Sequence, residues 1–134
     1  MGRWFVWSIV WYSIMAIGAA KGQFITPAKV GVYGVSVTPG TIVVGSDNGS
    51  ASSPVAYSNV INGVGPYAYL WTIQQPVSGD ISIHTPTEAN TQFTASGFNT
   101  AHVGTATITV TDLGKGSAET STDISVRFIF ENFN

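Results

Sequence analysis

The stretch Gly63–Ile73 constrains the fold of this 134-residue chain most, because it joins a turn to a strand that must be buried. The turn combines permissive and restricted backbone conformations within four positions, at Gly63, Gly65 and Pro66. Large apolar residues then recur at every second position, which places them on one face of a strand: Tyr67, Tyr69, Trp71 and Ile73. We predict a turn that leads into the central strand of a β-sandwich.

The composition favours β structure and excludes several kinds of site. Charged residues make up 9% of the chain, against about 25% in a typical soluble domain. Thr, Ser, Gly and Val are abundant, whereas the residues that favour surface helices are scarce. The chain has no cysteine, which excludes disulfides, thiolate metal sites and cysteine nucleophiles. A surface with so little charge is either covered in an assembly or kept soluble by hydroxyl groups.

The charge distribution argues against nucleic-acid binding. The net charge is −2, and the five basic residues are spread from Arg3 to Arg127. They form no cluster that could neutralise a run of phosphates.

Residues 4–20 contain no charged residue and lie between Arg3 and Lys21. Trp4, Trp7 and Trp11 recur at helical spacing, so we expect a helix here. The segment fits a membrane anchor at the lower limit of spanning length, or an arm buried against a partner subunit. It also resembles a signal peptide, an interpretation that we rank below the two in which the segment is retained.

Five large aromatic residues fall within nine positions of this segment, at Trp4, Phe5, Trp7, Trp11 and Tyr12. Side chains of this kind cannot stay in water without promoting association, and the core of a single sandwich is already filled by the β region. Burying each one is worth about 1.5–3 kcal/mol before ordering costs. We therefore predict that these five residues bind a partner, which is either protein or lipid.

The rest of the chain reads as one domain. We predict an arm or anchor with a linker over residues 1–29 and a β-sandwich over residues 30–134. After residue 30, apolar residues alternate in short runs about ten residues apart, which is typical of an antiparallel sandwich. The clearest run alternates threonine with Ala106, Ile108 and Val110. Composition predicts loops over residues 45–53, 96–104 and 112–116.

Five segments together carry a resemblance to a known family: Val-Ser-Val-Thr-Pro at 35–39, Gly-Val-Gly-Pro-Tyr-Ala-Tyr-Leu-Trp at 63–71, Ser-Gly-Asp-Ile-Ser-Ile at 78–83, Thr-Ala-Thr-Ile-Thr-Val-Thr-Asp at 105–112 and Ile-Ser-Val-Arg-Phe at 124–128. In this order they resemble immunoglobulin-like domains of the PKD-like kind, above all those attached to virion proteins of tailed bacteriophages. The resemblance covers roughly residues 33–130.

The resemblance implies an all-β, immunoglobulin-like antiparallel sandwich in which Trp71 is buried and residues 105–111 form the neighbouring strand. It also implies an adhesive, decorative or spacer module and not an enzyme. Domains of this kind also occur in bacterial surface proteins and in polysaccharide-degrading enzymes. The resemblance implies nothing for residues 1–29.

The sequence offers few residues for catalysis or metal binding. Ser82 or Ser96 could be combined with Asp80 and one of the two histidines, His84 and His102, but no nucleophile-elbow motif is present. Four aspartates in or beside turns could hold calcium in pairs, although turn chemistry explains them: Asp47, Asp80, Asp112 and Asp123. Asn48-Gly49-Ser50 is a formal glycosylation sequon that we interpret first as a turn. We predict no catalytic residue, no cofactor and no metal.

We expect a non-enzymatic structural component of a tailed-phage virion, associated with the capsid or the tail and held by its apolar arm. Its partners would be other virion subunits or copies of itself, with weak binding of host-surface glycans. The alternative is a membrane-anchored bacterial or phage-encoded protein that displays its sandwich at the cell surface or in the periplasm. A small carbohydrate-binding module that uses exposed Tyr or Trp side chains overlaps the first hypothesis.

Overall fold

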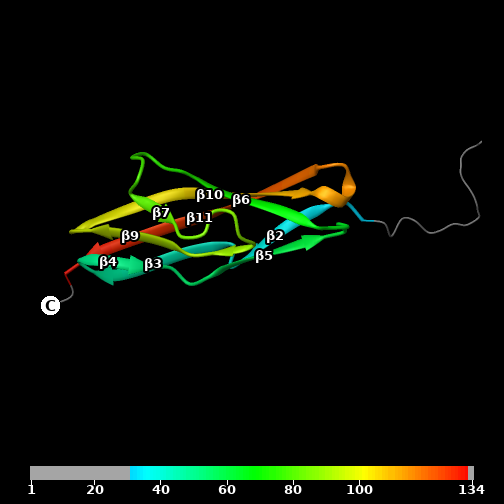
Figure 1. The fold of residues 1–134 in the computed structure, drawn as a ribbon. Coiled ribbons are helices and arrows are strands. Elements are labelled where there is room, and N and C mark those ends of the chain that lie inside the picture. The colour runs from blue at the N-terminus through cyan, green and yellow to red at the C-terminus, as the bar shows by residue number, and fades with distance from the viewer. Residues whose placement is uncertain (1–30, 133–134) are drawn as a thin grey trace, which may run out of the picture. The chain divides into compact units, whose positions relative to one another are not determined.

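The computed structural model describes residues 31–132, and from Tyr33 onward these belong to one compact unit, Tyr33–Asn134. This part of the chain is built of strands and one short 3-10 helix (Figure 1). The elements are β2 (Gly34–Thr38), β3 (Thr41–Asp47), β4 (Gly49–Ser52), β5 (Ala56–Ile61), β6 (Tyr67–Gln74), β7 (Ile81–Ile83), β8 (Asn90–Thr91), β9 (Phe93–Gly97), β10 (Thr100–Asp112), η2 (Leu113–Lys115) and β11 (Ala118–Glu131). The predicted all-β fold class is confirmed, whereas the predicted arm or helix lies outside the described residues.

The first layer is a four-stranded sheet in the order β3-β11-β10-β6. Its centre is a long antiparallel hairpin, in which β10 and β11 pair from Thr100 opposite Phe130 to Asp112 opposite Ala118 (Figure 1). Strand β6 runs antiparallel to β10. Strand β3 runs parallel to β11, so one edge of an otherwise antiparallel sheet is parallel.

The second layer consists of two three-stranded sheets, β2-β5-β8 and β4-β9-β7. The chain passes from one sheet to the other twice, from β4 into β5 and from β8 into β9. These two stretches run side by side, because β4 pairs with β9 in one sheet and β5 pairs with β8 in the other. Ser53 bridges the interruption between the two sheets. Its amide donates to the carbonyl of Phe93 at 2.8 Å, and its hydroxyl accepts from the amide of Phe93 at 2.9 Å. Side-chain bonding by one buried serine thus keeps the layer continuous where the ladder stops.

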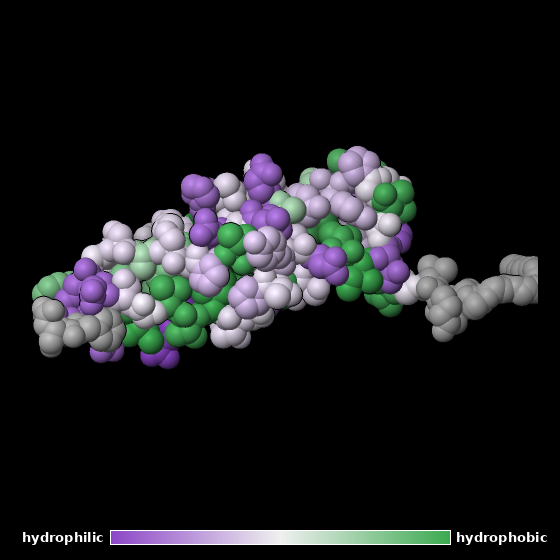
Figure 2. Space-filling view, turned by 90° about the horizontal axis from the view of Figure 1, so that it is seen from below, coloured by the Kyte–Doolittle hydropathy of each residue, from purple (hydrophilic) through white to green (hydrophobic). Residues whose placement is uncertain are grey.

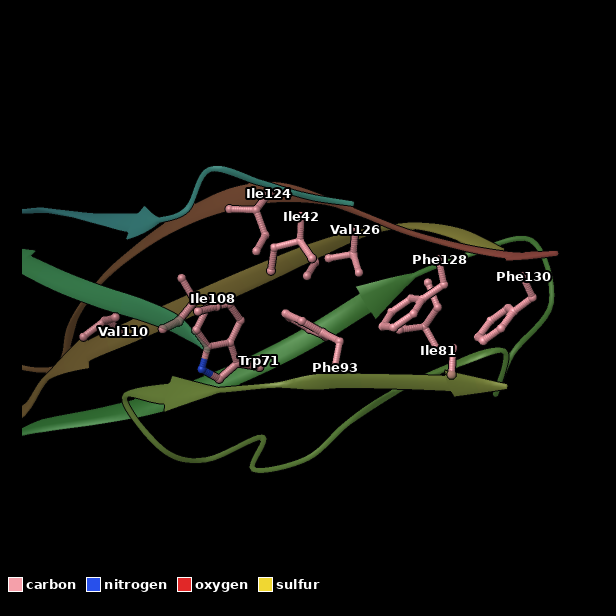
Figure 3. Close-up of a cluster of buried hydrophobic side chains, with 13 residues drawn as sticks. Ile42, Trp71, Ile81, Phe93, Ile108, Val110, Ile124, Val126, Phe128 and Phe130 are labelled. Atoms are coloured by element: carbon pink, nitrogen blue, oxygen red, sulfur yellow. The ribbon is translucent and has the colours of Figure 1, made fainter. Parts of the chain in front are cut away.

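The core lies between the layers and is filled by apolar residues that alternate along the strands, as the sequence pattern predicts (Figure 3). Ala106, Ile108 and Val110 are fully buried, while the threonines between them face outward. Strand β11 contributes four more inward residues, at Ile124, Val126, Phe128 and Phe130.

Trp71 is 1% exposed and packs edge-on against Phe93, with ring centroids 5.9 Å apart. Its indole nitrogen donates to the carbonyl of Glu88 at 2.9 Å, so the one polar atom of the buried ring is satisfied. Trp71 pairs with Ile108 of β10, which confirms both its burial and its neighbouring strand.

The prediction that this strand is central is wrong. Strand β6 lies at the edge of its sheet. The alternation of hydrophobic residues indicates that one face of the strand is buried. It does not indicate how many strands lie beside it. The segment after β7 protects this edge, because the amide of Trp71 donates to the carbonyl of Pro86 at 2.7 Å.

Two predicted loops are largely strands. Residues 45–53 hold the end of β3 and all of β4, and residues 96–104 contain only a short turn between β9 and β10. Both segments contain Gly and Ser, yet β4 pairs with β9, and the ends of β3 and β10 within them pair with β11. Backbone pairing decided the structure here, because strand propensity depends on the neighbours that a strand finds. The loop predicted at 112–116 is present and contains η2.

Replacing Trp71 by alanine is expected to lower the free energy of unfolding by about 3–5 kcal/mol, because the deletion leaves a cavity beside Phe93. Denaturant unfolding of the full chain followed by circular dichroism measures this loss. The control is Leu70→Ala, since the neighbouring Leu70 side chain is 49% exposed and should cost less than about 1 kcal/mol. Equal losses for the two variants would show that Trp71 does not anchor the core.

Candidate functional site

The predicted partner-binding residues Trp4, Phe5, Trp7, Trp11 and Tyr12 lie outside the described residues, and their role stays a prediction. The described domain offers three other groups of interest. These are a buried carboxylate, a histidine paired with an aspartate, and a groove on the outer face of the four-stranded sheet.

Asp112 is a fully buried carboxylate that holds one end of the domain together. It stands at the end of β10, and its oxygens accept hydrogen bonds from the amides of Val64 at 2.7 Å, Gly65 at 3.0 Å and Gly114 at 3.1 Å. Several amide donors compensate a carboxylate for the loss of water. Asp112 therefore ties the turn before β6 to the β10–β11 hairpin, and its carboxylate has a structural role.

The backbones at this end of the domain approach each other closely. The amide of Leu113 donates to the carbonyl of Pro66 at 2.9 Å. A Cβ atom at Gly114 would overlap the carbonyl oxygen of Gly65, so this position requires glycine.

Tyr33 and Lys115 complete the same end of the domain. The Tyr33 hydroxyl donates to the carbonyl of Val110 at 3.0 Å, and the Lys115 ammonium lies 5.5 Å from the centre of the Tyr33 ring. Partial burial, reinforced by the nearby Asp112 carboxylate, raises the pKa of Tyr33 above its ordinary value of 10.0.

The structure brings His102 and Asp80 together, with 3.2 Å between Nδ1 and a carboxylate oxygen. The other ring nitrogen, Nε2, lies 2.9 Å from the backbone carbonyl of Ser96. Both ring nitrogens thus face oxygen atoms of the domain itself. The arrangement ties the turn before β7 to β9 and β10.

The remaining candidates are dispersed. Asp123 accepts from the Thr107 hydroxyl at 2.6 Å, while Asp47 pairs in register with Glu131 at the end of the sheet. His84 is exposed and uses its backbone amide to bond the carbonyl of Gln92. Within residues 31–132, no three His, Asp or Glu residues come together as a metal site would require.

Asn48 acts as a turn residue. Its side-chain oxygen accepts from the Asn99 amide at 2.8 Å, and its side-chain nitrogen donates to the Asn99 side chain at 3.2 Å. The amide group of the formal sequon thus joins two turns at one end of the domain.

A groove of about 500 Å³ crosses the outer face of the four-stranded sheet. Seven of the residues that line it have side chains suited to contact a ligand: Val43, Gln74, Pro76, Val103, Thr105, Ser125 and Arg127. Arg127 lies between Val43 and Val103 across the strands, since it pairs in register with both. No sequence pattern predicts this groove, because its residues come from four separate strands and a loop.

Exposed aromatic residues are few in the described domain. Tyr57 is 55% exposed and Phe98 is 74% exposed, whereas Trp71 is buried and cannot contact a ligand. Figure 2 shows hydrophobic atoms reaching the surface in several separate groups with polar residues between them.

Known structures share this fold at low sequence identity. The PKD domain of human KIAA0319 matches with a TM-score of 0.53 and 12% identity, covering 84% of this chain and 96% of that domain. A PapD-like (ASH) domain of human CEP192 matches with a TM-score of 0.56 and 7% identity, covering 90% of this chain and 99% of that domain. The fold is immunoglobulin-like. Neither a protein-family model nor a curated protein sequence matches the chain.

The immunoglobulin-like domain and the residues adjoining it, from 31 to 132, include no helix of the length and apolar character needed to cross a membrane.

Replacing Asp112 by alanine is expected to destabilise the immunoglobulin-like domain by about 2–4 kcal/mol, because three amides lose a charged acceptor. Asp112→Asn should recover part of this loss, since one side-chain oxygen can still accept. Chemical denaturation measures both values, with the exposed Asp47→Asn as control. A loss for Asp112→Ala no larger than that of the control would contradict the structural role of the carboxylate.

The raised pKa of Tyr33 makes stability depend on pH under alkaline conditions. The folded state holds the phenol proton more tightly than the unfolded state, so the contribution is complete below pH about 10 and is lost as the pH rises through the folded-state pKa. Tyr33→Phe removes this contribution. The difference in unfolding free energy between wild type and Tyr33→Phe should therefore shrink above pH about 10, and a constant difference from pH 8 to pH 11.5 would oppose this assignment.

Proposed function

We propose that this protein is a non-enzymatic structural component of a tailed-phage virion. In this proposal the apolar N-terminal segment attaches the protein to other virion subunits of the capsid or tail. The immunoglobulin-like domain is displayed for decoration, weak adhesion or reinforcement of an interface. The observation that carries the proposal is the uncharged stretch of residues 4–20 with its five aromatic side chains.

The packing of the described domain supports a separate role for that stretch. The strands supply their own core, with thirteen buried apolar side chains from both layers. A partner is therefore needed to cover the aromatic residues of the N-terminal segment, since large exposed apolar surfaces mark interaction sites.

The chemistry of the described domain supports a role without catalysis. Both nitrogens of His102 are engaged by acceptors, and the buried Asp112 is surrounded by amides. The virion setting itself is supported by the resemblance of residues 33–130 to domains of tailed-phage virion proteins.

The alternative is a membrane-anchored surface protein that displays the same domain. It is favoured by the length of the uncharged stretch, which is close to the minimum for a spanning helix. Tryptophan also suits the interface of a bilayer.

Replacing Trp7 and Trp11 together by alanine is expected to abolish incorporation into virions, because the partner surface loses two large apolar anchors. Mass spectrometry of purified particles measures incorporation, and circular dichroism of the variant should keep the β spectrum. Tyr57→Ala is the matched control, since it removes an exposed aromatic side chain from the sandwich itself. Unchanged incorporation of the double variant would refute the attachment role.

Fractionation separates the two settings. A virion component is expected in purified particles with its N-terminal peptide present. If the full chain instead sediments with membranes and is missing from particles, the membrane-anchored alternative replaces the virion proposal.

A further inference from the structure

We propose that the groove around Arg127 binds an acidic saccharide, with the guanidinium group contacting a sugar carboxylate. The groove lies on the outer face of the β3-β11-β10-β6 sheet and has a volume of about 500 Å³. Ligand sites commonly have volumes of about 300–1,000 Å³, so the groove has room for one or two sugar rings.

Arg127 has no charged cross-strand neighbour on its face of the sheet. Within residues 31–132 it forms no ion pair. Its cross-strand neighbours on the same face are Val43 and Val103, which are 60% and 46% exposed and carry no charge. The other basic side chain of the described domain, Lys115, donates to the carbonyl of Asn62 at 3.1 Å and lies beside Tyr33. Arg127 is thus the charged group available to an anion, and its planar fork matches a carboxylate.

Polar and apolar groups are mixed around the Arg127 guanidinium. Ser125 and Thr105 pair in register and line the groove with their hydroxyl-bearing positions, and Gln74 continues the same row. Val43, Val103 and Pro76 supply apolar surface beside them. Hydroxyls and an amide suit the hydroxyl groups of a sugar, while the aliphatic surface suits its C–H face.

The position of the groove argues against a peptide as its occupant. Arg127 lies on β11, which is hydrogen-bonded to a strand on each side, as is β10. A peptide cannot add to the sheet as a further strand there, because the backbone groups are already paired. Recognition must come from side chains, and a single arginine with hydroxyls and an amide fits a carboxylated sugar better than an extended chain.

Carboxylates lie on the same face of the sheet on both sides of Arg127. Asp47 and Glu131 pair in register on one side, and Asp123 follows Ser125 on the other. Their negative charges disfavour ligand carboxylates beside them, so the charged group of the ligand is expected at Arg127 itself.

An acidic saccharide would be the ligand through which the displayed domain adheres. The biological use of the site therefore rests on the function proposed above. Its chemistry can be tested without reference to particles or membranes. A failure of binding would leave the attachment role of residues 4–20 intact, and a failure of attachment would leave the binding result intact.

The test is an NMR titration of the full chain with trigalacturonate and with its fully methyl-esterified counterpart, which has the same sugar rings without the charges. Trigalacturonate should shift the signals of Val43, Val103 and Arg127 in a saturable way. The ester should bind at least about tenfold more weakly, because it cannot form a charge-assisted hydrogen bond with Arg127. Equal binding of the two would overturn the proposal, as would no binding of trigalacturonate.

Two variants test the site itself. Arg127→Gln should weaken the binding of trigalacturonate about tenfold, and so should Val103→Glu, which places a competing carboxylate opposite Arg127. Ser121→Ala, an exposed change on the same strand outside the groove, should leave binding unchanged. Unaltered binding by both groove variants would overturn the site.

A third ligand tests the class of occupant. Acetyl-Val-Glu-Val-amide presents one carboxylate on a peptide with aliphatic neighbours. It should bind more weakly than trigalacturonate, whose hydroxyl groups meet the hydroxyls and the amide of the groove. If it binds as tightly or more tightly, the assignment of a saccharide is wrong and the groove accepts acidic peptides.

Discussion

The hydrogen bonds to the buried Asp112 carboxylate hold together the two segments on which the sandwich depends. One is the turn at residues 63–66, which aims β6 into the core, and the other is the end of the long β10–β11 hairpin. Burying a carboxylate is unfavourable unless donors replace water, and the amides of Val64, Gly65 and Gly114 do so. Because Gly114 also lies against the Gly65 backbone, bonding and steric fit select the same arrangement of the two turns.

Beyond this end of the domain, the packing of the strands is determined by burial of their inward faces. Trp71 enters the core opposite Ile108 and meets Phe93 from the second layer. The pairing of β10 with β11 continues along the hairpin and places Phe128 and Phe130 at the other end of the core, with their rings stacked 6.2 Å apart. The two ends of the domain are closed differently: Asp112 binds backbone amides at one, and His102 binds Asp80 and the Ser96 carbonyl at the other.

The sequence predicted what local patterns can encode. Alternation of threonine with Ala106, Ile108 and Val110 identified a strand and its buried face, and the spacing of Trp71 identified its burial. It could not predict that β6 lies at an edge or that the Gly- and Ser-rich residues 45–52 are largely strand, since both depend on distant partners. The structural role of Asp112 depends on amide donors 47 and 48 positions earlier in the chain, so the sequence alone does not distinguish it from a calcium ligand. The groove depends on the register that sets Arg127 between Val43 and Val103.

The attachment role and the ligand site proposed above fall on different parts of the chain. Within residues 31–132 the buried apolar side chains come from both layers of the sandwich, whereas the proposed attachment role falls on aromatic residues at positions 4–12, outside the described residues. The outer sheet face is under a different constraint, because its side chains do not support the core and can vary while the hairpin stays intact. Arg127 stands on that face without a counter-charge among its cross-strand neighbours. A guanidinium in such a position adds little to the stability of the fold, since isolated surface charges contribute little, and it stays available for the acidic ligand proposed above.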